Sequence, residues 1–128
     1  MIGQFKAVTV SSQPEQLRDR TKAFALRVIR LYRSLPYKTD TQVLGKQLLR
    51  CGTSVAANYR AVCRARSKAE FIAKMGIVVE EADEAILWLE LMTESGIVSM
   101  KKTEALLKEA HELTAIFAAS QRTARNAA

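Results

Sequence analysis

The chain has 128 residues, of which 48% are hydrophobic and 26% charged, and its formal net charge is +7. This balance excludes a disordered chain, and five Gly and two Pro are few enough to favour helices in a single domain. No uncharged apolar run is long enough to span a membrane, and the first residues lack the apolar core of a signal peptide. We therefore expect a soluble, cytoplasmic protein.

The first helix is expected after an irregular start. Residues 1–12 show no helical period, which predicts a loose or strand-like arm before a helical domain at 13–125. Pro14 suits the first turn of a helix, and Pro36 ends it. Apolar positions recur between them in steps of three and four, as on one face of a bundle helix. These positions are Leu17, Thr21, Phe24, Val28, Leu31 and Leu35.

A second helix is expected at about 41–66, capped by Thr39 or Asp40. Gly52 lies in a run of small residues, which predicts close approach of another helix or, alternatively, a break. Cys51 and Cys63 stand about 18 Å apart along this helix, so we expect two unbridged packing residues. The predicted core face carries Leu44, Leu48, Cys51, Val55, Tyr59 and Val62.

Two further helices follow. Ser67 and Glu70 form a capping box that opens the third helix, and Gly96 suits its C-terminal cap. Ser99 is expected to cap the fourth. Four helices with short connectors predict an all-α, antiparallel, up-down-up-down four-helix bundle. The expected core positions are Phe71, Met75, Val78, Ala82, Ala85, Leu89 and Met92, then Thr103, Leu107, Ala110, Leu113 and Phe117.

Positive charge is concentrated in the first half of the chain. Met1–Lys74 carries 15 Lys and Arg against 4 Asp and Glu, whereas Met75–Ala128 carries 5 against 9. A row of Lys and Arg opposite the core of the second helix suits a phosphate backbone. The alternative is a charged face neutralised by the acidic half, within the bundle or across an interface. The candidate nucleic-acid-binding residues are Lys46, Arg50, Arg60, Arg64, Arg66, Arg27 and Arg30.

Base-specific contacts are not expected, because the sequence shows no nucleic-acid fold motif and no aromatic platform for stacking. Binding to RNA or DNA would be electrostatic and salt-sensitive.

The third helix is apolar beyond its core face. Ile77, Leu87, Trp88 and Leu91 point away from the main seam, and a wider apolar surface predicts a second buried face. We interpret these four residues as an oligomer interface, with Trp88 as a candidate anchor. The alternative is packing against the first or fourth helix or the arm.

The sequence offers no catalytic site. Its single histidine, His111, has Lys108 three positions before it, so the Glu-x-x-His pairs of di-metal bundles are missing. One His with scattered Ser residues defines no hydrolytic triad, and no phosphate-binding Gly loop occurs. We therefore predict a non-enzymatic protein without cofactor or metal.

The segment from Leu44 to Val98 resembles the small bacterial four helix bundle proteins, a family that includes proteins encoded in intervening sequences of large-subunit ribosomal RNA genes. The resemblance covers roughly residues 20–120 and rests on the order and spacing of short motifs. These are Leu48 with Arg50, Ser54 and Asn58, Ser67 before Phe71, and Glu81, Glu84 and Leu89 before Gly96.

The resemblance implies a four-helix bundle that assembles into a ring-shaped homopentamer, without established catalytic activity. The family is also similar in build to the basic accessory protein of diversity-generating retroelements, which implies nucleic-acid binding. The chain departs from the family pattern at Arg60, where an acid is expected. Asn58 beside the core face is expected to make a helix-to-helix hydrogen bond. The alternative function is a protein–protein interaction scaffold with an unidentified partner and no nucleic-acid ligand.

Overall fold

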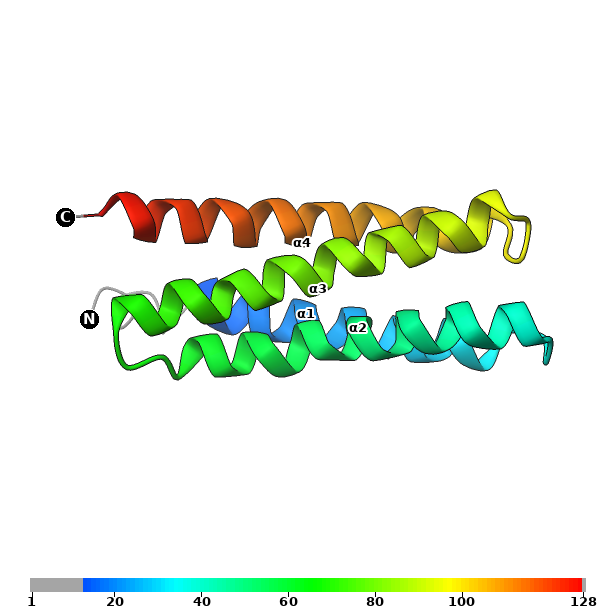
Figure 1. The fold of residues 1–128 in the computed structure, drawn as a ribbon, viewed down its shortest axis with the longest axis horizontal. Helices are drawn as coiled ribbons and strands as arrows, with labels where there is room; N and C mark the ends of the chain where they lie inside the picture. Colours follow the sequence, from blue (N-terminus) through cyan, green and yellow to red (C-terminus); the bar gives the residue numbers. More distant parts are fainter. Residues whose placement is uncertain (1–12, 128) are drawn as a thin grey trace.

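The computed structural model describes residues 13–127, and these form an antiparallel four-helix bundle (Figure 1). The helices are α1 (Gln13–Arg33), α2 (Thr39–Cys63), α3 (Lys68–Glu94) and α4 (Met100–Asn126). Each helix packs beside the next along the chain, and α1 and α4 close the bundle with the loosest contact. The predicted fold is confirmed. The arm predicted for residues 1–12 lies outside the described residues.

The core follows the predicted helical periodicity. Phe24, Val28, Leu48, Leu89 and Phe117 are among its fully buried side chains. Each of these side chains removes more than about 100 Å² of surface from water on folding. This burial supplies most of the stability of a bundle. Four predicted core residues are only partly buried, namely Leu35, Leu44, Phe71 and Leu107, whereas Leu106 beside Leu107 is buried.

The two hairpins are packed in different ways. A Cβ on Gly52 would lie 2.9 Å from both γ-carbons of Val28, so the glycine allows α1 to approach α2 closely. The expected close approach is confirmed, and α2 runs through without a break. Hydrogen bonds between side chains, or from a side chain to the backbone, also link α3 and α4. The hydroxyls of Thr93 and Thr103 are 2.8 Å apart, and Gln121 Nε2 donates to Ile72 O at 3.0 Å.

Both ends of α3 agree with their sequence signals. Ser67 Oγ accepts the Glu70 N–H at 3.0 Å, and Glu70 Oε1 accepts the Arg66 N–H at 2.6 Å. Gly96 adopts a φ of +84°, which ends α3 in the left-handed conformation that glycine tolerates.

The cap predicted for the second helix is wrong, because Lys38 and not Thr39 or Asp40 is the N-cap of α2. Ser99 stands at the N-cap of α4 as predicted, but its side chain makes no capping hydrogen bond.

The predicted bounds of the second helix are wrong by two or three residues. It begins at Thr39, where Asp40 Oδ1 accepts the Thr41 N–H inside the first turn. It ends at Cys63 because the Arg64 N–H turns back to Ala61 O. Within residues 13–127, no helix combines the length and the apolar character that crossing a membrane requires.

Candidate nucleic-acid interface

The two hairpins of the bundle carry opposite charge. Residues 13–66, which include α1 and α2, contain twelve Lys and Arg against three Asp and Glu. Residues 67–127, which include α3 and α4, contain seven Lys and Arg against ten Asp and Glu. The charge asymmetry of the sequence therefore becomes an asymmetry between two sides of one molecule.

One arginine bridges the seam between α1 and α4. The Arg20 guanidinium donates through Nε and Nη2 to Glu109 at 3.0 and 2.7 Å, and through Nη2 to Glu112 at 3.1 Å. Glu109 and Glu112 are about one helical turn apart, so both carboxylates face the same side of α4. The hydrogen bond to Glu109 is the main cause of a raised pKa of Arg20.

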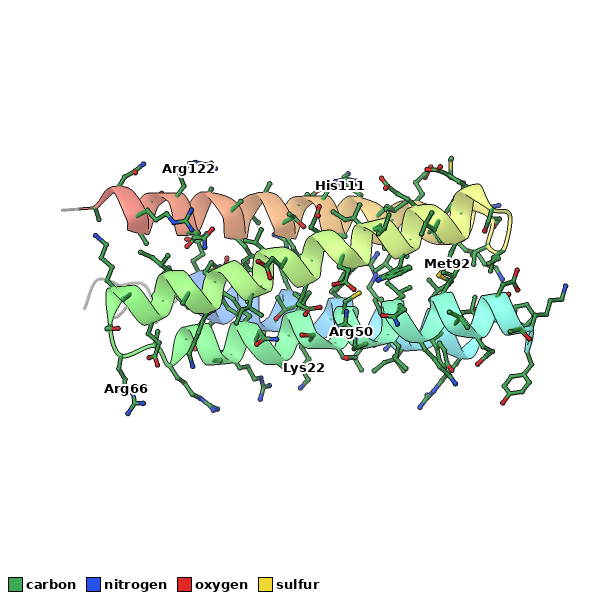
Figure 2. The ribbon with its side chains drawn as sticks, in the orientation of Figure 1. Lys22, Arg50, Arg66, Met92, His111 and Arg122 are labelled. Carbon is green, nitrogen blue, oxygen red and sulfur yellow. The ribbon has the colours of Figure 1, made fainter. Side chains whose placement is uncertain are left out.

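A second arginine bridges the seam between α2 and α3 in the same way. Arg50 Nη1 lies 3.1 Å from Glu81 Oε1, and Nη2 lies 2.6 Å from Glu84 Oε2. Figure 2 labels Arg50 on this seam. The hydrogen bond to Glu84 is the main cause of a raised pKa of Arg50. Among the described residues, Arg50 is the one candidate that forms an ion pair, and the sequence pattern alone did not reveal this contact.

The other candidate residues remain exposed or half-buried on the basic side. Lys46 and Arg60 lie on α2, Arg64 is its C-cap, and Arg66 follows in the connector. On α1, Arg30 is exposed and Arg27 half-buried. No ion pair joins any of these six to a carboxylate within residues 13–127. In Figure 2, Lys22 and Arg66 lie on the side of the bundle opposite His111 and Arg122 of α4.

Three of the four residues of the predicted oligomer interface are exposed, and the fourth is half-buried. Ile77, Leu87 and Leu91 are 43%, 45% and 40% exposed on the outer face of α3. Trp88 is instead half-buried against the core, and its indole N–H donates to Glu84 Oε2 at 3.3 Å. The uncovered apolar surface is therefore the three aliphatic side chains, which we call the α3 outer face.

The two cysteines lie in different environments. Cys51 is fully buried, and burial raises the pKa of its thiol to about 12. Cys63 is exposed, so its expected role as a packing residue is wrong. The last turn of α2 directs Cys63 outward because the buried positions there are Tyr59 and Val62. Burial is also the main cause of a raised pKa of Tyr59.

The helix-to-helix hydrogen bond expected of Asn58 is also wrong. Its Nδ2 donates to Ser54 O at 2.9 Å and to Ser54 Oγ at 2.7 Å, both within α2. Residues four apart face the same side of a helix, so Ser54 is the nearest acceptor. Asn58 therefore contributes no described link between helices.

A mainly apolar hollow of about 620 Å³ opens where α1 begins and α4 ends. Leu17, Phe71, Met75 and Ile116 contribute to its lining, with Gln13 at the edge. The described residues around it include no acid, amine, imidazole or thiol. The polar groups of its described lining are the amide of Gln13 and the hydroxyls of Tyr59, Ser120 and Thr123. His111 lies exposed on α4.

The profile of the 23S rRNA-intervening sequence proteins matches residues 15–119. The chain belongs to this family. A solved structure from Bacteroides thetaiotaomicron VPI-5482, described as a protein of unknown function from the S23 ribosomal protein family, superposes with a TM-score of 0.80. It is 31% identical, and the match covers 87% of this chain and 99% of that one. No curated protein matches the chain.

The family membership confirms the resemblance seen in the sequence and agrees with the bundle. Arg20 and Arg50 as seam bridges were not anticipated. A signal was nonetheless present in the sequence, because each arginine meets two glutamates spaced three apart. Arg20 meets Glu109 and Glu112, and Arg50 meets Glu81 and Glu84. Sequence spacing places two carboxylates on one helix face, but only the packing of helices chooses the cation.

Proposed function

We propose that this protein is a non-catalytic, oligomeric helical-bundle protein that binds RNA or DNA electrostatically through the exposed face of α1 and α2. The observation that carries the proposal is the row of cations on this face that have no ion pair among the described residues. Arg20 and Arg50 are held by glutamates, yet Lys46, Arg60 and Arg64 keep no carboxylate partner within residues 13–127. Neutralisation within the bundle therefore accounts for only part of the basic charge.

Phosphate chemistry favours a nucleic acid as the partner. Arginine presents a planar fork of donors to phosphate oxygens, and a row of cations releases counterions when it binds a polyanion. Lys46 and Arg64 are eighteen residues apart along α2, about 27 Å along the axis, which is long enough for several phosphates. The contacts would be largely independent of base sequence.

The test is binding of fluorescent RNA and DNA measured by anisotropy over a series of salt concentrations. Wild-type affinity should fall steeply with salt, with a log–log slope of about −0.7 to −0.9 for each phosphate contacted. The double variant R60E/R64E should lose binding and keep its helical circular dichroism, because both side chains are exposed and unpaired among the described residues.

The matched control reverses two exposed lysines on the other hairpin. K101E/K108E changes the net charge by the same amount on α4 and should retain most of the binding. Equal losses in both double variants would show only a response to net charge. Unchanged binding by R60E/R64E would rule out this surface.

We further propose that a second copy of the chain covers the α3 outer face. Leu87 and Leu91 are exposed one helical turn apart on the same side of α3, and Ile77 is exposed about three turns before them. Water disfavours exposed aliphatic side chains. The family resemblance implies a pentamer. In light scattering coupled to size exclusion, wild type should exceed the monomer mass, and L87E/L91E should dissociate it.

The exposed Leu26 on α1 provides the matched control for this second proposal. L26E introduces a charge at a side chain of similar exposure and should leave the assembly intact. A monomeric wild type would contradict the proposal. Assembly without nucleic-acid binding would favour the alternative function, a protein–protein interaction scaffold.

A further inference from the structure

Tyr37 is the most exposed aromatic residue that the structure describes. Its side chain is 93% exposed in the connector between α1 and α2. The other aromatic residues of the described chain are buried or half-buried, including Phe24, Tyr59 and Trp88. A large apolar ring is thus open to solvent, which folding alone does not favour.

The backbone that carries this ring is braced by hydrogen bonds on both sides. Pro36 O accepts the Lys38 N–H at 3.0 Å and Gln42 Nε2 at 3.4 Å. Gln42 Oε1 in turn accepts the Tyr32 hydroxyl at 3.0 Å, so Gln42 of α2 holds both the connector and α1. A ring on a fixed turn loses little conformational entropy when a partner binds.

Positive charge surrounds the same turn. Arg33 ends α1 just before the connector, and Lys38 precedes α2, and both side chains are exposed. Arg30 and Lys46 continue this charge along the two helices. The nearby Asp40 carboxylate already accepts the Thr41 N–H at 2.7 Å. The tyrosine therefore stands at one end of the proposed phosphate-binding face.

We infer that Tyr37 is a base-stacking residue, and that the protein engages an unpaired base of a single-stranded nucleic acid at the α1–α2 connector. This inference rests on the proposed function and deepens it, because it specifies single strands over duplexes. An open aromatic ring beside cations is the combination that single-strand binders use. The sequence-based expectation of no stacking platform did not anticipate a ring left this bare.

The experiment compares three probes by anisotropy: a single-stranded RNA, an abasic ribose-phosphate strand of equal length, and the RNA duplex. Wild type should bind the RNA more tightly than the abasic strand. Y37A should weaken RNA binding by about 5- to 150-fold, the range that loss of one stacked base produces. Its binding to the abasic strand and the duplex should not change.

Two variants separate stacking from other effects. Y37F keeps the ring and should bind the RNA like wild type. V43A removes an exposed apolar side chain from α2 and should also bind normally. Equal affinity of Y37A and wild type for the RNA would overturn the inference while leaving the electrostatic function standing. Failure of wild type to bind any of the three probes at low salt would instead overturn the proposed function itself.

Discussion

The hairpin of α1 and α2 and the hairpin of α3 and α4 share one core but differ in chemistry. The first is closely packed through Gly52 and carries an excess of cations. The second carries an excess of acids, and its helices are linked by polar contacts such as Thr93 with Thr103, as Tyr32 and Gln42 link the first. One arginine on each seam joins the basic hairpin to the acidic one.

This difference separates two uses of charge in a single bundle. Arg20 and Arg50 are directed to glutamates and serve the packing of helices. Lys46, Arg60 and Arg64 face solvent on the same hairpin and form no ion pair among the described residues. Most cations of this hairpin are therefore side chains without an ion pair among residues 13–127.

The largest loss of stability is expected from adding a methyl group at Gly52 in the first hairpin. The same change at Gly76 in the second hairpin is the control. G52A should lower the free energy of unfolding by about 1–3 kcal/mol, because Val28 Cβ and its γ-carbons already occupy the space. G76A should stay within about 1 kcal/mol of wild type, because its new Cβ meets only the movable end of Gln121. Urea denaturation measures both.

A double-mutant cycle identifies the cause. V28A removes the γ-carbons that Gly52 faces, so G52A should cost less in the V28A background than in wild type. An equal cost in both backgrounds would mean that the loss comes from somewhere other than the α1–α2 contact.

Cys51 allows a test where the basic hairpin meets the acidic one. Burial raises the pKa of its thiol from the ordinary 9.0 to about 12. The unfolded chain therefore releases this proton first as the pH rises, so the stabilisation is complete below about pH 9 and is lost between about 9 and 12. At about pH 10 the effect should be on the order of 1 kcal/mol.

The measurement is urea denaturation of wild type and C51A at about pH 8 and about pH 10. The difference in stability between the two proteins should shrink at the higher pH, because C51A lacks the titrating thiol. Alkylation at the lower pH adds a second readout. Cys63 should react in the folded protein and Cys51 only after unfolding. A constant difference between the proteins would contradict the assigned burial effect.

The smallest effects are expected at the two seams. R20A should cost about 0.5–1 kcal/mol, because its two-pronged contact with Glu109 is partly shielded from water. R50A should cost less, about 0.2–0.5 kcal/mol, because Arg50 is more exposed at 49%. Both losses should shrink in about 1 M salt.

K22A provides the reference for these ion pairs, since Lys22 is exposed on α1 without an ion pair among the described residues. Its stability should match wild type. A larger loss of stability in R50A than in R20A would show that burial does not decide which of the two ion pairs is stronger.

The helices and most of the core could be predicted from the order of residues alone. The repeat of apolar residues from Leu17 to Phe117 places one stripe on each helix, and four such stripes bury one another only in a bundle. Local signals also located the capping serine Ser67 and the terminal Gly96, because they depend on residues a few positions apart.

Which charges are paired, and which side chains stay bare, depends on how the helices pack. Arg50 and Arg60 have the same chemistry on the same helix, yet Arg50 alone of the two meets glutamates of α3. Cys63 and Asn58 differ from expectation for local reasons. Cys63 lies off the buried face that Tyr59 and Val62 define, and Asn58 donates to Ser54 one turn earlier in α2. Periodicity gives the inward direction of a helix, but the partner of a long polar side chain is set by the distance and angle of the next helix.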